Sequence, residues 1–248
     1  MKTYVVLNDI QIPFQDTKVL KLVTDFAVRL KPHGVILNGD IVDCYSISDF
    51  DRNPLSKATL DREIAGAHRL MGLFRNIPEK VWIGGNHEDR LRRHVWKAPK
   101  LVAGLDARSR ERLVQALDFP EVFGLGEADF QWLPYGATLP LGKLLVTHGS
   151  IVSKHSGQSA KAHLEKYGAS VLIGHTHRGG VHYKRDVKGV HAAIENFCLC
   201  RLDPEYVQHP NWQQGFAVVH VNSNGHFNVT SIPILPGPSF MYGGEVIK

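Results

Sequence analysis

The first third of the chain alternates short apolar runs with segments whose apolar residues recur at helical spacing. Residues 3–8, 34–37 and 80–83 are apolar runs of strand length, whereas residues 17–30 and 59–74 repeat apolar positions every three or four residues. Lys31-Pro32 ends the first predicted helix, and Gly84-Gly85 ends the third predicted strand. This order of strands and helices predicts an α/β fold with a doubly wound sheet.

The remainder of the chain predicts a helical segment followed by many short strands. Residues 90–123 are helical in pattern and basic, which suggests a helical cap insertion around residues 90–128. Short strands broken by Pro134-Tyr135-Gly136 are predicted within 130–146, and others at 144–147, 170–173, 180–184, 190–195, 215–221 and 226–234. A hairpin turn at 222–225 and a second, largely antiparallel sheet are expected. Because the sequence has no internal repeat or linker, residues 1–248 are predicted to form a single domain.

Polar side chains follow most of these apolar runs. The residues at these strand ends are Asp9 and Gln11, Asp40 and Asp43, Asn86 and His87, His148, and finally His175 and His177. The carboxyl ends of parallel strands meet at one edge of a sheet, where α/β proteins bind ligands. Two divalent ions roughly 3.5–4 Å apart need a shared anionic ligand with oxygen and imidazole donors around it. Asp40 can bridge such a pair of ions.

The composition is that of a globular protein with anionic partners. The 248 residues carry a formal net charge of +5 and include 14 histidines, and neutral imidazole is a common metal ligand. No apolar stretch is long enough to span a bilayer, so we expect a cytoplasmic protein without membrane contact. Cys44, Cys198 and Cys200 are expected to be reduced thiols. The last two offer only two of the four ligands of a structural zinc site.

The polar clusters resemble the motifs of the calcineurin-like metallophosphoesterases. The family's D-x-H, G-D-x-x-D, G-N-H-E/D, histidine-containing loop and G-H-x-H correspond to residues 9–11, 39–43, 85–88, 147–149 and 174–177. The small size of the chain and its residues 85–91 look most like members found in bacteriophage and bacterial genomes. The resemblance implies a four-layer sandwich of two mixed sheets flanked by helices. It also implies phosphoester hydrolysis in the cytoplasm of a bacterium or a phage-infected cell.

The resemblance further implies a division of the ligands between two ions. One ion would be held by Asp9, Gln11, Asp40 and His177, and the other by Asp40, Asn86, His148 and His175. A hydroxide between the ions would be the nucleophile. His87 would lie near the leaving oxygen as a proton donor, and Asp43 would orient it.

Gln11 departs from the family pattern, which usually has histidine at this position. An amide oxygen is a neutral, hard donor, so we expect two divalent ions that are Mn²⁺ or Mg²⁺ in preference to Zn²⁺ or iron, with Mn²⁺ the first expectation. Weaker occupancy of the site that contains Gln11 is expected to follow.

Basic and aromatic residues outside the motifs add candidates for substrate binding. Arg90, Arg93 and Lys97 recur at near-helical spacing, where a solvated helix face is the simpler interpretation of the set. Arg90 is the candidate that binds substrate, because it lies closest to His87. Structural or surface roles are expected for His182, His191, His209, His220 and His226, which match no motif. For Trp96, Trp132 and Trp212, packing in the core or under a cap segment is favoured over base stacking.

The resemblance specifies a phosphoester bond and leaves the substrate open. The basic charge favours phosphodiesters of nucleotides or nucleic acid, with a phosphorylated small molecule as a further partner. The alternative is a phosphomonoesterase or a protein phosphatase, although Cys44-Tyr45 stand where protein phosphatases carry Arg-Gly. A metal-binding interaction module with weak catalysis is a hypothesis of another class. Gln11 favours that hypothesis, whereas the retained histidines argue against it.

Overall fold

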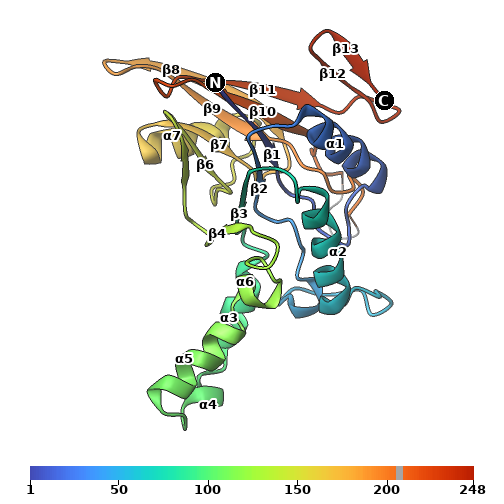
Figure 1. Ribbon diagram of the computed structural model, residues 1–248, viewed down its shortest axis with the longest axis vertical. Helices are drawn as coiled ribbons and strands as arrows, with labels where there is room; N and C mark the ends of the chain where they lie inside the picture. Colours follow the sequence, from blue (N-terminus) through green and yellow to red (C-terminus); the bar gives the residue numbers. More distant parts are fainter. Residues whose placement is uncertain (205–208) are drawn as a thin grey trace.

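The computed structural model describes residues 1–204 and 209–248, and Figure 1 shows two sheets with helices on their outer faces. The first sheet has the strand order β11-β10-β1-β2-β3-β4. Its strands are β1 (Lys2–Leu7), β2 (Gly34–Asn38), β3 (Glu79–Ile83), β4 (Gln131–Leu133), β10 (Gly215–Val221) and β11 (Phe227–Pro233). Strands β1 to β4 run parallel, and β10 and β11 extend the sheet in antiparallel fashion beside β1.

The second sheet has the order β5-β6-β7-β9-β8. Its strands are β5 (Leu139–Leu141), β6 (Leu144–Thr147), β7 (Ser170–Ile173), β8 (Gly179–Asp186) and β9 (Gly189–Asn196). Two strand pairs are parallel and two are antiparallel, so the sheet is mixed. The expectation of a largely antiparallel second sheet that includes residues 215–221 and 226–234 is therefore wrong. Those residues form β10 and β11 of the first sheet, because β10 pairs with β1 from Lys2 to Val6 and β11 pairs with β10.

Alternating apolar residues of the strands build two hydrophobic layers. Val5 and Leu7 of β1 pack on the side of α1 (Thr17–Leu30) and α2 (Leu60–Leu73), whereas Tyr4 and Val6 face the second sheet. On the far side of that sheet, α7 (Gln158–Tyr167) packs Leu164 against β7. Helix, sheet, sheet and helix make up the four-layer α/β sandwich, which confirms the predicted fold class.

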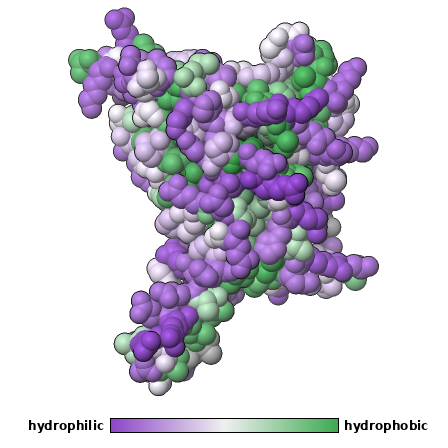
Figure 2. All heavy atoms as spheres, in the orientation of Figure 1, coloured by the Kyte–Doolittle hydropathy of each residue, from purple (hydrophilic) through white to green (hydrophobic). Residues whose placement is uncertain are grey.

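The segment predicted as a helical cap is helical and extends from the body as an arm (Figure 1). It contains α3 (Asp89–Lys97), α4 (Pro99–Val102), α5 (Ala107–Ala116) and α6 (Phe119–Val122). Figure 2 shows a largely hydrophilic arm with some apolar atoms at its surface, and Trp96 is 64% exposed there. In the view of Figure 1 the arm points away from both sheets.

The remaining elements are short. The 3₁₀ helix η1 (Tyr45–Ile47) follows the loop after β2, and β12 (Phe240–Tyr242) and β13 (Glu245–Ile247) form a hairpin next to the C-terminus that the sequence did not predict. The turn between β10 and β11 lies at the predicted place, with Gly225 N donating to Asn222 O. In the part of the chain that the structure describes, no helix has the length and apolar character needed to span a membrane.

Candidate functional site

The predicted ligands lie in loops that follow strands at one edge of the two sheets. Asp9 and Gln11 follow β1, Asp40 follows β2, Asn86 follows β3, His148 follows β6, and His175 and His177 follow β7. The backbones of Asp9, Gln11, Asp40, His175 and His177 have positive φ angles of 51°, 56°, 52°, 69° and 57°. Non-glycine residues rarely adopt this conformation, and such residues tend to occur at functional sites. Local sequence propensity alone would therefore not have indicated these turns.

Two groups of potential ligands meet at Asp40. Ligand atoms of Asp9, Asp40 and His177 lie within 4.8 Å of one another, and so do those of Asp40, His148 and His175. Gln11 adjoins the first group, because its Nε2 donates a hydrogen bond to Asp40 Oδ2 at 3.4 Å. The structure therefore brings Asp9, His148, His175 and His177 of the two predicted ligand sets together around Asp40, a carboxylate that a pair of bridged ions could share.

Several buried polar atoms of this cluster have no hydrogen-bond partner among the described residues. They are Asp9 Oδ1, Gln11 Oε1, Asn86 Oδ1, His148 Nε2 and His175 Nδ1. Burial of a polar atom without a partner is unfavourable, so such atoms call for a ligand. His177 Nε2 approaches Asp9 Oδ1 to 3.0 Å, and His148 Nε2 approaches Asp40 Oδ2 to 3.3 Å, without hydrogen-bond orientation in either case. Oxygen and nitrogen atoms that converge in this way fit divalent cations.

Burial and the neighbouring charges shift the pKa values of the residues in this cluster. Burial lowers the pKa of His148, but the Asp40 carboxylate outweighs it and raises that pKa to about 9. Burial also opposes ionisation of Asp40, yet the histidines around it, His148 first, hold its pKa well below the usual value. His175 behaves in the opposite way, because burial and the neighbouring His148 lower its pKa to about 4. Bound metal cations would offset the negative charge of these carboxylates, as protons on the histidines do.

The Asp40 loop is held by Glu88, whose role the motif alone did not reveal. The buried Glu88 carboxylate accepts hydrogen bonds from the backbone N–H groups of Gly85, Asp40, Ile41 and Val42, at 2.8, 2.9, 2.8 and 3.3 Å. Glycine is required at position 85, because a Cβ there would lie 2.1 Å from Asp40 Oδ1. The G-N-H-E motif therefore positions the bridging carboxylate as well as contributing a ligand.

His87, Asp43 and Arg90 form a connected group beside Asp40. His87 Nδ1 lies 3.0 Å from the Asp43 main-chain carbonyl and 3.6 Å from its carboxylate, and His87 Nε2 lies 3.6 Å from Asp40 Oδ2. Arg90 donates to both the carbonyl and the carboxylate of Asp43, at 2.6 and 3.0 Å. Asp43 thus contacts His87 chiefly through its main chain, while its carboxylate pairs with Arg90.

Asn38 and Asn8 connect the two sheets behind the ligand cluster, and no sequence motif marks them. The side-chain amide of Asn38 in β2 donates to Thr147 O of β6 at 3.0 Å. The main-chain carbonyl of Asn38 lies 2.9 Å from His148 Nδ1. This contact leaves His148 Nε2 free to face a metal. Asn8 donates to Asp9 Oδ2 at 2.6 Å and to Phe197 O at 2.9 Å. Each contact joins residues that are distant in sequence, except for the adjacent pair Asn8 and Asp9.

Cys200 and Trp212 complete the surroundings of His177. Cys200 Sγ lies 3.7 Å from His177 Nδ1, and the Trp212 ring centroid lies 4.2 Å from that of His177. Hydrogen bonds with Cys198 and then with His177 lower the pKa of Cys200 to about 6 against the effect of burial. Among the described residues all three cysteines are free, as expected. Trp212 lies at the site, whereas packing in the core or under a cap segment was favoured for it.

The other candidates have their own partners. Arg93 pairs with Asp89 and Lys97 pairs with Asp49, which fits an ordinary solvated helix. Outside the motifs, His191 contacts Asp186, His220 contacts Thr3 and His226 contacts Lys143.

The chain matches a family model and known phage proteins in sequence. A family model described as calcineurin-like phosphoesterase matches residues 2–179. The chain is 31% identical to the Gene 54 protein of Mycobacterium phage D29, over 99% of this chain and 98% of the relative. It is 29% identical to the Gene 54 protein of Mycobacterium phage L5, over the same shares. Vps29 from Chaetomium thermophilum superposes with a TM-score of 0.49 at 10% identity, over 97% of this chain and 95% of that protein.

Proposed function

Because the chain belongs to the calcineurin-like phosphoesterases, we propose that it hydrolyses phosphoester bonds with two divalent ions that share Asp40. The observation that carries this proposal is the pair of ligand groups that meet at Asp40. The buried atoms that face this cluster without hydrogen-bond partners among the described residues support the same conclusion. In this proposal Asp9, Gln11 and His177 complete one site, and Asn86, His148 and His175 complete the other.

The ions would, when bound, offset charge on the phosphoryl oxygens and supply a hydroxide nucleophile near neutral pH. We propose Mn²⁺ as the ion, since Gln11 contributes an oxygen donor where an imidazole would favour zinc. Gln11 Oε1 is buried with no hydrogen-bond partner among residues 1–204 and 209–248, which supports coordination through that atom.

His87 is proposed to donate a proton to the leaving oxygen. Burial lowers the pKa of His87, but Asp40 and then Asp43 outweigh it, so that the pKa is raised, which is the direction that a proton donor needs. Arg90 NH2 lies 3.4 Å from His87 Nε2 while NH1 is held by Asp43. This placement supports a role for Arg90 in contacting a phosphoryl oxygen next to His87.

Phosphodiesters of nucleotides or nucleic acid are the proposed substrates. A net charge of +5 favours polyanions, and the proposed setting is the cytoplasm of a bacterium or a phage-infected cell. Phosphomonoester or phosphoprotein hydrolysis is the alternative within the same chemistry.

The test is hydrolysis of bis(p-nitrophenyl) phosphate and p-nitrophenyl phosphate with added Mn²⁺. We expect turnover that EDTA abolishes, faster on the diester, with Asp40→Asn and His87→Ala reduced at least about a hundredfold. Because Asp40→Asn would also lose metal, bound Mn²⁺ is measured for each variant. His87→Ala should retain its metal. Turnover no greater than that of Asp40→Asn on both substrates would contradict the proposal and favour a metal-binding interaction module.

A further inference from the structure

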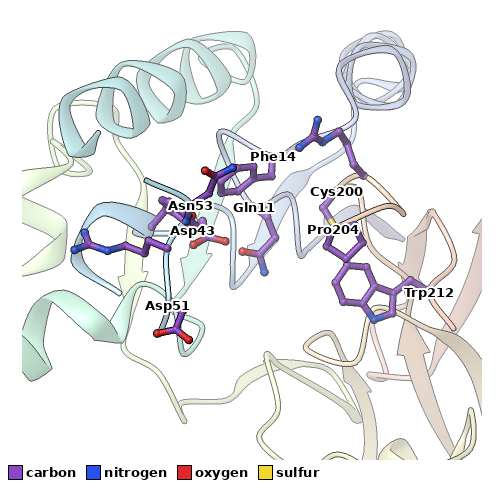
Figure 3. Close-up of a pocket in the computed structure, with 11 residues that line it drawn as sticks. Gln11, Phe14, Asp43, Asp51, Asn53, Cys200, Pro204 and Trp212 are labelled. Atoms are coloured by element: carbon purple, nitrogen blue, oxygen red, sulfur yellow. The ribbon is translucent and has the colours of Figure 1, made fainter. Parts of the chain in front are cut away.

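A cavity of about 300 Å³ adjoins the candidate metal centre and shares Gln11 and Asp43 with it. Figure 3 shows Gln11 in the middle of the view, between Asp43 and Asn53 on one side and Cys200 and Trp212 on the other. Ligand sites in proteins measure roughly 300–1,000 Å³, so this cavity suits one flat ring system better than a folded segment of a partner. A group bound here would be attached to a phosphate at the metals.

Three half-buried aromatic side chains line the cavity. The rings of Phe14 and Tyr45 have centroids 5.1 Å apart with an interplanar angle of 70°, so they form one corner. Trp212 lies at the other side and contacts the His177 ring. Partly exposed aromatic rings around a small cavity offer faces on which another ring can stack.

Two arginines at the rim suit the phosphate of a ligand, beside the carboxylates of Asp43 and Asp51. Arg52 and Arg201 are exposed and line the cavity, and the Arg201 guanidinium lies 6.0 Å from the Phe14 ring centroid. Asp51 and Asn53 add polar groups that can pair with the edge of a heterocycle. Arginines suit phosphates that flank a bound ring, because guanidinium groups form paired hydrogen bonds with phosphate oxygens.

We propose that this cavity binds a nucleobase whose sugar carries the phosphate that is hydrolysed at the metal centre. This inference rests on the proposed function and specifies its substrate class. Stacking of a base on aromatic side chains is tolerant of base identity, so the cavity selects nucleotides over other phosphodiesters without reading a sequence.

The test compares a dinucleoside monophosphate, thymidylyl-thymidine, with its counterpart in which both bases are replaced by hydrogen. The ratio of kcat/KM for thymidylyl-thymidine to kcat/KM for the base-free counterpart, measured with Mn²⁺, should exceed about ten in the natural protein. Phe14→Ala and Trp212→Ala should each lower that ratio about tenfold, because each removes a stacking face. Trp96→Ala is the matched control, since Trp96 lies on the arm and contacts Arg92, and it should leave the ratio unchanged.

Binding to the Mn²⁺-loaded His87→Ala variant, which should retain its metal but hardly turn over, separates this proposal from the hydrolase function. Thymidine 5′-monophosphate should bind about tenfold more tightly than deoxyribose 5-phosphate in a calorimetric titration, and Phe14→Ala should abolish the difference. Equal affinities would overturn the base pocket whether or not the protein hydrolyses phosphodiesters. Faster hydrolysis of a phosphotyrosine peptide than of thymidylyl-thymidine would also overturn it and assign the cavity to an aryl phosphate. Failure on bis(p-nitrophenyl) phosphate with base-dependent binding intact would overturn only the hydrolase function.

Discussion

Replacement of Glu88 by glutamine would test whether the metal centre is held by a single buried carboxylate. Glu88 Oε2 accepts N–H groups from Gly85 and Asp40, and Oε1 accepts them from Ile41 and Val42. A glutamine side chain has one acceptor oxygen, so either orientation turns its NH₂ group toward two N–H donors. An unsatisfied buried donor costs roughly 1–3 kcal/mol, and two of them give about 2–6 kcal/mol.

This loss is large beside the roughly 5–15 kcal/mol that stabilises a typical domain. The measurement is urea unfolding in EDTA at pH 7.5, so that metal binding does not contribute. Glu165→Gln is the control, because Glu165 is exposed and pairs only at 3.9 Å with Lys161. Mn²⁺ affinity should also fall by roughly tenfold or more, since Glu88 holds the Asp40 backbone. A change in unfolding free energy below about 0.5 kcal/mol for Glu88→Gln would refute the reasoning.

Three further predictions concern metal choice and titration. Gln11→His should shift metal preference from Mn²⁺ toward Zn²⁺ in a dialysis competition read by elemental analysis, and an unchanged preference and stoichiometry would exclude Gln11 as a ligand. Burial lowers the pKa of His148, but Asp40 outweighs it and raises that pKa to about 9, so Mn²⁺ binding at pH 7.5 should release protons. Calorimetry in buffers of different ionisation enthalpy should detect this release, and binding heats that do not depend on the buffer would contradict it. Burial and, after it, Asp43 raise the pKa of Glu63 to about 8, so the folded protein binds this proton more tightly than the unfolded chain and its stability should fall as pH rises from about 4.5 to 8. Urea unfolding at pH 5.5 and 8 should show a smaller fall in unfolding free energy for Glu63→Gln than for the natural protein. Equal falls would be inconsistent with this reasoning.

Strands β1 to β3 of the first sheet were predictable because they are short apolar runs buried on both faces. In β2, all five residues from Gly34 to Asn38 are buried, so the sequence pattern and the burial coincide. The partner of β1 was not predictable in this way. Strand β10 lies more than two hundred residues from β1 along the chain, and apolar pattern gives no information on which strands pair.

Helix α7 was missed for a different physical reason. Its buried positions are Ser159, Ala160, His163 and Leu164, so only one large aliphatic side chain marks the face that packs on the second sheet. Glu195 takes part in anchoring this helix, since its carboxylate accepts from the backbone N–H groups of Ser159 and Ala160. A helix held by buried polar contacts lacks the periodic apolar stripe on which prediction from pattern depends.

Motif order was enough to predict which candidate ligands cluster at Asp40, but not the residues that position them. A buried asparagine such as Asn38 carries no distinctive spacing, and its partners Thr147 and His148 lie over a hundred residues away. Trp212 illustrates the same limit, because it lies near no motif in sequence yet contacts the His177 ring. Roles of this kind depend on tertiary contacts that only the folded chain provides.

Gln11 connects the two unusual features of this protein. Its side chain belongs to the ligand group around Asp9 and Asp40, and it also lines the cavity with Phe14 and Trp212. An amide at this position offers one oxygen to a cation and retains an NH₂ group that can donate elsewhere, whereas an imidazole that binds a metal presents only a ring edge. The departure from the family's histidine therefore lies where the metal centre meets the cavity. A role for Gln11 in metal preference alone would give its position in the cavity wall no function. Gln11→His should therefore alter both the metal preference and the ratio of kcat/KM for thymidylyl-thymidine to kcat/KM for the base-free substrate. A purely coordinating role predicts a change in the metal preference alone.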